Sequence, residues 1–98
     1  MKEIIISADG DSIVYLVPDV VANDLRNYCI YFCDKWMKTN PHARKYKVNG
    51  GYCYNEADFI DYLNRWVFPD RPSTLVKELD CYDYELPKEY RGYPKFNF

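Results

Sequence analysis

The sequence has little of what marks exported, membrane-bound or catalytic proteins. Its first apolar stretch, Ile4 to Ile6, gives way to Ala8 and Asp9 and is too short for a signal peptide or a membrane span. We therefore expect a cytoplasmic protein with no membrane contact. A hydrophobic content of 48% also excludes a disordered chain, because disorder requires few apolar residues.

Histidine is almost absent, which limits the catalytic chemistry available to the chain. The single histidine, His42, lies in a polar stretch that matches no cysteine–histidine active site. The Asp-Gly-Asp sequence at 9–11 is typical of a tight turn, and no glycine-rich phosphate-binding motif is present. We expect no catalytic residue and no cofactor. A small enzyme of unknown reaction is the second alternative to the function proposed below.

The cysteines lack the Cys-x-x-Cys spacing of zinc knuckles. Cys29 and Cys33 are one helical turn apart, a spacing that metal ligands can use, but both fall within an apolar stripe. We therefore expect no metal site, and reduced thiols that pack as small apolar side chains. The four cysteines are Cys29, Cys33, Cys53 and Cys81.

Aromatic residues, by contrast, are abundant. They make up 18% of the chain, and tyrosine alone accounts for 11 residues. Such enrichment is typical of a small core that needs bulky side chains or of a surface that contacts another protein. Residues 82–98 are the richest segment, with Tyr82, Tyr84, Tyr90, Tyr93, Phe96 and Phe98.

The net charge of −2 conceals an uneven distribution of charge. Residues 35–54 contain no acid, whereas the segments before and after them are mainly acidic. Cations interleaved with Trp36 and Tyr46 are what single-strand nucleic-acid binders use, which makes nucleic-acid association the first alternative function. The basic residues of the segment are Lys35, Lys38, Arg44, Lys45 and Lys47.

Four elements follow from apolar periodicity and turn residues. The β-branched, apolar runs 4–6 and 13–17 predict a hairpin. Either both strands are covered on each face, or the second face of the first strand contacts a partner or the C-terminal tail. Apolar residues that recur every three or four positions predict a helix over 19–39 that ends before Pro41. Asn49-Gly50-Gly51 favours a second hairpin or a strand broken by a glycine bulge, and Asn55 starts a helix over 56–67.

The two helices are predicted to share one core. At about 100° per residue, the apolar residues of the first helix fall within an arc of about 120°, with Tyr28 at its edge. Ile30 and Met37 lie outside this arc, on a face that other residues mark as solvent-exposed. The predicted core residues are Leu25, Phe32, Trp36, Phe59, Leu63 and Trp66.

The remaining chain completes a single α+β domain over 1–98. Residues 73–79 favour a helical turn, with a strand as the alternative. Residues 82–98 are predicted to form an extended aromatic tail that packs on the rest of the domain. The element order predicts an antiparallel sheet of about four or five strands with two main helices on one face.

A protein-interaction module is the function that these patterns favour. By analogy, small proteins without catalytic residues often act as inhibitors, adaptors or immunity-type factors in bacteria and phages. We therefore expect a protein partner or a homo-oligomer. Apolar residues on a wet helix face and tyrosines in an acidic segment predict the contact surfaces. The predicted interaction residues are Ile30, Tyr31, Met37, Tyr82 and Tyr84.

Overall fold

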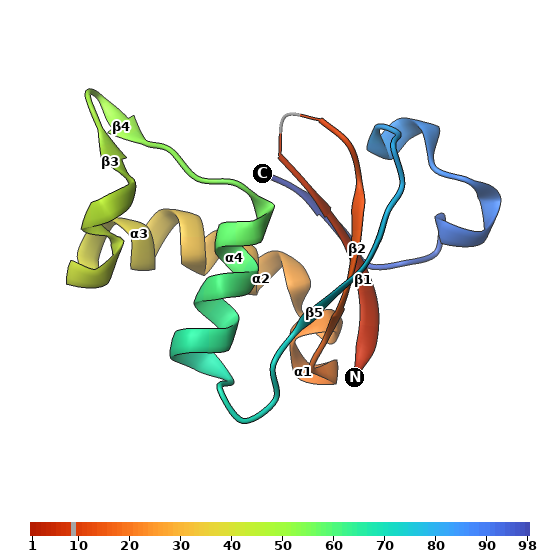
Figure 1. The fold of residues 1–98 in the computed structure, drawn as a ribbon, viewed down its shortest axis with the longest axis horizontal. Coiled ribbons are helices and arrows are strands. Elements are labelled where there is room, and N and C mark those ends of the chain that lie inside the picture. The colour runs from red at the N-terminus through yellow and green to blue at the C-terminus, as the bar shows by residue number, and fades with distance from the viewer. Residues whose placement is uncertain (9) are drawn as a thin grey trace.

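A four-stranded sheet lies at the centre of the computed structural model, which describes residues 1–8 and 10–98 (Figure 1). Asp9, in the predicted turn, lies outside the described residues. The strand order is β5-β2-β1-β6, and helices cover one face of the sheet. The predicted α+β class is confirmed.

The first hairpin is confirmed. β1 (Lys2–Ser7) pairs antiparallel with β2 (Ile13–Val17), and Ile4 lies opposite Tyr15. Successive side chains of a strand point to opposite faces, so Ile4 packs beneath the helices while Ile5 packs on the other side. Both faces are covered, as the run of apolar residues predicted.

The edges of the sheet differ from the prediction in two ways. Residues 73–79 contain a strand, β5 (Thr74–Glu78), rather than a helical turn, because β2 offers its backbone for antiparallel pairing. The sheet is mixed rather than antiparallel, since β6 (Lys95–Asn97) runs parallel to β1. β5 and β6 therefore point the same way, and residues 79–94 supply the long crossover that parallel strands need.

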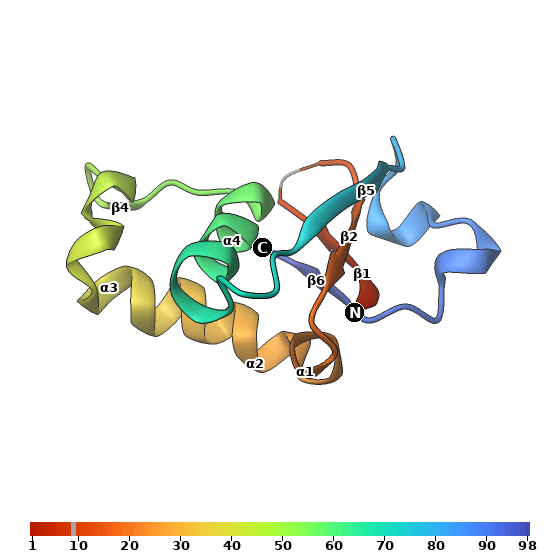
Figure 2. The same cartoon turned by 60° about the horizontal axis from the view of Figure 1, so that its bottom comes forward.

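The helix predicted over 19–39 forms over that whole length, in successive pieces (Figure 2). The pieces are α1 (Asp19–Asn23), α2 (Leu25–Ile30), a π-helical segment (Tyr31–Trp36) and α3 (Met37–Thr39). Asp24 has a non-helical φ of −139° and separates α1 from α2. The helix ends before Pro41, as predicted.

The π-helical segment changes which side chains face the core. A π turn holds more residues than an α turn, so the residues that follow are rotated relative to an ideal α-helix. Met37, predicted on the solvent face, is only 2% exposed, and Trp36 beside it is 6% exposed. The prediction for Met37 is wrong for this reason.

The second helix consists of α4 (Glu56–Tyr62) and a π-helical continuation, Leu63–Val67. Asn55 and Asp58 form the capping box that starts it, as the cap residue predicted. Trp66 lies in the π-helical part and is 47% exposed, so its predicted place in the shared core is wrong.

The second hairpin is confirmed and stands apart from the main sheet. A 3-10 helix (Pro41–Tyr46) leads into β3 (Lys47–Val48), which pairs with β4 (Gly51–Tyr52). Gly50 has a φ of +82°, a conformation that glycine adopts without steric cost. The Cys53 amide donates to the Tyr46 carbonyl at 2.8 Å and ties the hairpin to the 3-10 helix.

Apolar clusters fill both sides of the sheet. The larger cluster lies between the sheet and the helices, and Phe96 and Phe98 pack against it. The smaller one joins Ile5 and Val14 to Leu86, and Tyr93 packs against it. Residues 82–98 are less extended than predicted, because they contain two 3-10 turns, Asp83–Glu85 and Lys88–Tyr90, before β6.

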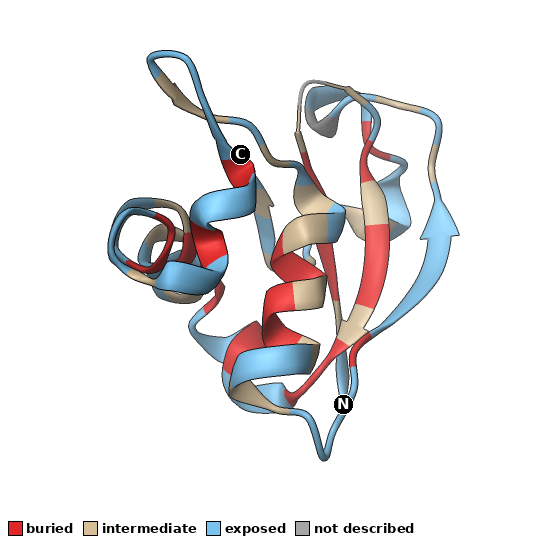
Figure 3. Cartoon of the chain, turned by 60° about the vertical axis from the view of Figure 1, so that its left-hand side comes forward, coloured by how far each residue is buried: buried red, intermediate tan, exposed pale blue. Residues whose placement is uncertain are grey.

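The β5 edge is exposed along its whole length (Figure 3). Leu75 is 55% exposed and Val76 47%. The register between β2 and β5 shifts at this point, so that Val14 pairs with Lys77 and Tyr15 with Leu75. Irregularities and charged residues of this kind are the features by which edge strands avoid pairing with other chains.

Candidate protein-interaction site

A concave surface beside α2 combines tyrosine rings with one carboxylate. Its cavity measures about 310 Å³. Tyr28 and Tyr31 are three residues apart on the first helix, and Tyr62 ends α4, so the packing of two helices brings the rings together. We call this surface the tyrosine pocket; its lining residues are Asp24, Asn27, Tyr28, Tyr31 and Tyr62.

The three tyrosines of the pocket differ in exposure. Tyr62 is 5% exposed, Tyr28 is half-buried, and Tyr31 is 48% exposed. The Tyr28 ring packs against the Phe68 ring at a centroid distance of 6.3 Å. A partner side chain entering the pocket would therefore contact the buried ring of Tyr62 and the exposed ring of Tyr31. Tyrosine is suited to this position because its side chain has few rotatable bonds, so little conformational entropy is lost when it is immobilised on binding.

The carboxylate of the pocket is held in place locally. Asp24 occupies the break between α1 and α2, and the Asn27 side-chain amide donates to its Oδ1 at 2.8 Å. Asp24 therefore offers a positioned anionic acceptor beside aromatic rings. Rings and carboxylates both attract cations, so the pocket is suited to a cationic side chain.

Burial changes the acidity of Tyr62, the most buried tyrosine of the pocket. It is the largest cause that raises the pKa of Tyr62 to about 12, and the nearby Tyr31 and Tyr28 hydroxyls raise it further. The neutral phenol is thus the form that the folded protein holds.

Stability is expected to fall as the pH rises from about 10 to about 12. The unfolded chain releases the Tyr62 proton near its ordinary pKa of about 10, whereas the folded chain keeps it until about pH 12. The folded state binds more protons in this window, so its advantage is complete below pH 10 and is lost as the pH rises through the folded pKa. Urea unfolding of the parent and of Tyr62→Phe, measured at several pH values, checks this. If the free energy of unfolding fell equally with pH in the parent and in Tyr62→Phe, this prediction would be contradicted.

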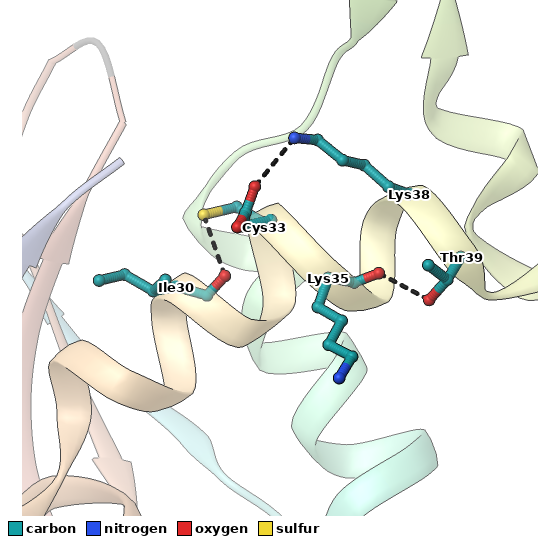
Figure 4. Close-up of polar contacts among 6 residues, drawn as sticks. Ile30, Cys33, Lys35, Lys38 and Thr39 are labelled. Atoms are coloured by element: carbon teal, nitrogen blue, oxygen red, sulfur yellow. Dashed lines mark hydrogen bonds and ion pairs between the residues drawn. The ribbon is translucent and has the colours of Figure 1, made fainter.

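The pocket contains one of the five predicted interaction residues, Tyr31. Ile30 is half-buried, and its carbonyl accepts a hydrogen bond from the Cys33 thiol at 3.7 Å (Figure 4). Met37 is buried and offers no outer surface. The predicted helix-1 patch therefore reduces to Tyr31 and the exposed part of Ile30.

Tyr82 and Tyr84 form a separate aromatic surface. Their rings stack at a centroid distance of 5.5 Å and an interplanar angle of 8°, and they are 48% and 78% exposed. The segment that carries them lies across the sheet from the helices (Figure 1). The structure does not bring the two predicted surfaces together.

The basic residues predicted for nucleic-acid binding also separate in space. Lys38, Arg44 and Lys47 line one surface cavity, whereas Lys35 and Lys45 do not. Lys35 and Lys38 point to opposite sides of the helix (Figure 4). The Lys45 Nζ lies 5.1 Å from the centre of the Tyr46 ring. Trp36, the predicted stacking residue, is 6% exposed.

The groups considered for catalysis are placed apart as well. The His42 ring stacks on Trp66 at 4.1 Å, and no contact among the described residues joins it to a cysteine. The four cysteines are unbridged thiols, of which Cys29 is buried, and this burial raises its pKa. In residues 1–8 and 10–98, no three His, Cys, Asp or Glu side chains are placed to hold a metal ion.

Sequence reasoning missed most of the tyrosine pocket. Tyr28 was visible at the edge of the apolar arc, but Asp24, Asn27 and Tyr62 carried no pattern that pointed to a shared site. The exposed apolar residues of β5 were missed because that segment was predicted to be a helical turn. The β-branched Thr74 and Val76 were the available signal for a strand.

No helix in the described part of the chain has the length and apolar character needed to cross a membrane. Comparisons with protein-family models, with curated proteins and with solved structures found no match. The functional assignment therefore depends on the geometry of the surfaces described above.

Proposed function

We propose that this chain is a non-catalytic protein-interaction module that binds its partner through the tyrosine pocket. The observation that supports this most directly is the 48% exposure of Tyr31 at the rim of a concave, tyrosine-lined surface. Binding hot spots are enriched in tyrosine and lie in pockets from which water is excluded on binding. Inhibitor, adaptor and immunity-type factor, of bacterial or phage origin, are the roles we propose for such a module.

The chemistry of the pocket favours a basic partner side chain. Asp24 supplies a negative charge, and the faces of Tyr28 and Tyr31 carry negative electrostatic potential. A cavity of about 310 Å³ is large enough for one arginine or lysine side chain of the partner. The partner is therefore a protein that presents a cationic side chain, and a second copy of this chain is the homo-oligomeric alternative.

Nucleic-acid association through residues 35–47 remains the alternative function. The cavity lined by Lys38, Arg44 and Lys47 favours it, because these cations could contact phosphate groups. The burial of Trp36 weighs against it, since a buried ring cannot stack on a base.

Replacing Tyr31 by alanine is expected to abolish capture of the partner while leaving the fold intact. Loss of a hot-spot tyrosine weakens binding roughly thirtyfold, since such residues contribute about 2 kcal/mol or more. Tyr82→Ala is the matched control, because Tyr82 is also 48% exposed but belongs to the segment after β5, which lies across the sheet from the helices. Capture from native lysate by the parent and both variants, followed by mass spectrometry, makes the comparison.

Each outcome of this capture experiment is informative. A protein retained by the parent and by Tyr82→Ala but lost from Tyr31→Ala supports the proposal. Loss from Tyr82→Ala alone would assign the interaction to the Tyr82/Tyr84 surface instead. Material that is sensitive to nuclease and lost from Lys47→Glu would support nucleic acid. Both tyrosine variants should melt close to the parent, because exposed substitutions change stability by about 0.5 kcal/mol or less.

A further inference from the structure

Residues spaced by three line one surface cavity near the second hairpin. Lys38, Pro41, Arg44 and Lys47 all border it, and its volume is about 190 Å³. The 3-10 helix Pro41–Tyr46 explains why Pro41, Arg44 and its cap residue Lys47 lie together, because side chains three residues apart are eclipsed in a helix of three residues per turn. Two of the three cations of the cavity therefore project from the same face of this helix and its cap.

The hairpin adds an aromatic wall to this cavity. Lys47 on β3 lies directly opposite Tyr52 on β4, so their side chains are on the same face of the hairpin. Tyr52 is half-buried and lines the cavity beside the cations. The turn at Gly50 and the bond from the Cys53 amide to the Tyr46 carbonyl fix this arrangement.

The positive charge of the cavity is only partly neutralised. Lys38 reaches back along the helix and forms an ion pair with Asp34 at 2.8 Å (Figure 4). Arg44 and Lys47 have no ion-pair partner among the residues that the structure describes, and no acid lines the cavity. Two exposed cations therefore lie on one concave surface, and no acid among the described residues lines it.

Two neutral polar atoms of the cavity lining are already hydrogen-bonded. The Thr39 hydroxyl donates to the Lys35 carbonyl at 2.7 Å (Figure 4), and Asn40 Oδ1 accepts from the His42 amide at 2.9 Å. Arg44 and Lys47 are therefore the charged groups on which the binding of an anion would mainly depend. Their donors are suited to an oxyanion, because guanidinium binds two oxygens at once and ammonium acts as a compact charge.

We infer that this cavity binds the phosphate group of a small phosphorylated ligand. A phosphate monoester carries close to two negative charges at neutral pH, which matches the two unpaired cations. The volume of about 190 Å³ admits the phosphate and a few further atoms. The Tyr52 ring lines the same cavity, where it would contact the organic part of the ligand. The site shares no lining residue with the tyrosine pocket and does not depend on the proposed function.

Titration with inorganic phosphate, adenosine 5′-monophosphate and adenosine tests the inference. Amide shifts in a two-dimensional NMR spectrum locate the bound ligand, and their concentration dependence gives the affinity. We expect phosphate and the nucleotide, but not adenosine, to shift amides of residues 37–53. A nucleotide that binds more tightly than phosphate would identify the nucleotide as the source of the group through contact with Tyr52.

Charge-matched variants separate a site from general electrostatic attraction. Arg44→Gln and Lys47→Gln each remove one positive charge from the cavity lining, and Lys45→Gln removes one from the same segment outside the lining. The first two should weaken binding about tenfold, as expected for loss of a charged hydrogen bond. Lys45→Gln should change it less than twofold. Equal weakening in all three variants, or no shift of these amides at millimolar phosphate, would overturn the inference.

Discussion

Replacing Phe32 by alanine should destabilise the protein by about 3–5 kcal/mol. Phe32 is fully buried and belongs to the cluster between the sheet and the helices. A cavity at this position removes contacts with both helices and with the C-terminal segment at once. The rings around Phe32 lie at centroid distances between 5.0 and 6.1 Å and belong to Trp36, Tyr54, Phe59, Tyr62 and Phe98.

Thermal and urea unfolding of Phe32→Ala measure this effect. A loss of this size is a large fraction of the roughly 5–15 kcal/mol that stabilises a domain, so the variant should be partly unfolded at room temperature or melt far below the parent. Tyr31→Ala, one residue away but exposed, is the matched control and should melt close to the parent. A Phe32→Ala protein that melted within two degrees of the parent would contradict the described core.

Deleting residues 95–98 should have a comparably large effect. The deletion removes β6 and the backbone bond at 2.8 Å from the Phe98 amide to the Ser7 carbonyl. It also removes Phe96 and Phe98, which pack against the main cluster, and Phe98 lies 5.6 Å from Phe59. Loss of two such side chains should cost about 3 kcal/mol or more.

The control for this deletion is Asn97→Ala, because Asn97 is exposed in the same strand and contributes little packing. The free energy of unfolding measured in urea should be well below that of the parent for the deleted chain and close to it for Asn97→Ala. Unchanged melting of the deleted chain would mean that the segment does not pack on the body in solution. In that case residues 95–98 would be available to a partner.

Local signals were sufficient for the first hairpin and for the extent of both helices. Ile4 to Ile6 and the β-branched run from Ile13 favour strands whatever surrounds them, and a turn composition joins them. Pro41 and the Asn55 cap determine helix ends through their own backbone chemistry. These elements were predictable because their causes lie within a few residues of each other.

The candidate sites were predictable only in part. Tyr31 was predicted as part of the apolar surface on the outer face of the first helix, and the basic character of 35–47 follows from composition. The tyrosine pocket needs Tyr62 from a second helix, and the phosphate cavity needs Tyr52 from a hairpin. Which of several exposed tyrosines or lysines share a surface depends on how the elements pack, and a single sequence does not contain that information.

By itself the sequence determined the α+β class, the first hairpin, the two helices and the abundance of aromatic residues that fill the core. Tertiary structure alone decided the direction of β6, the strand at residues 74–78, and the burial of Met37 against the exposure of Trp66. Strand pairing depends on which backbone lies alongside, and that backbone is distant in the chain. Burial depends on helix phase, which the π-helical turns shift by an amount that no wheel of about 100° per residue predicts.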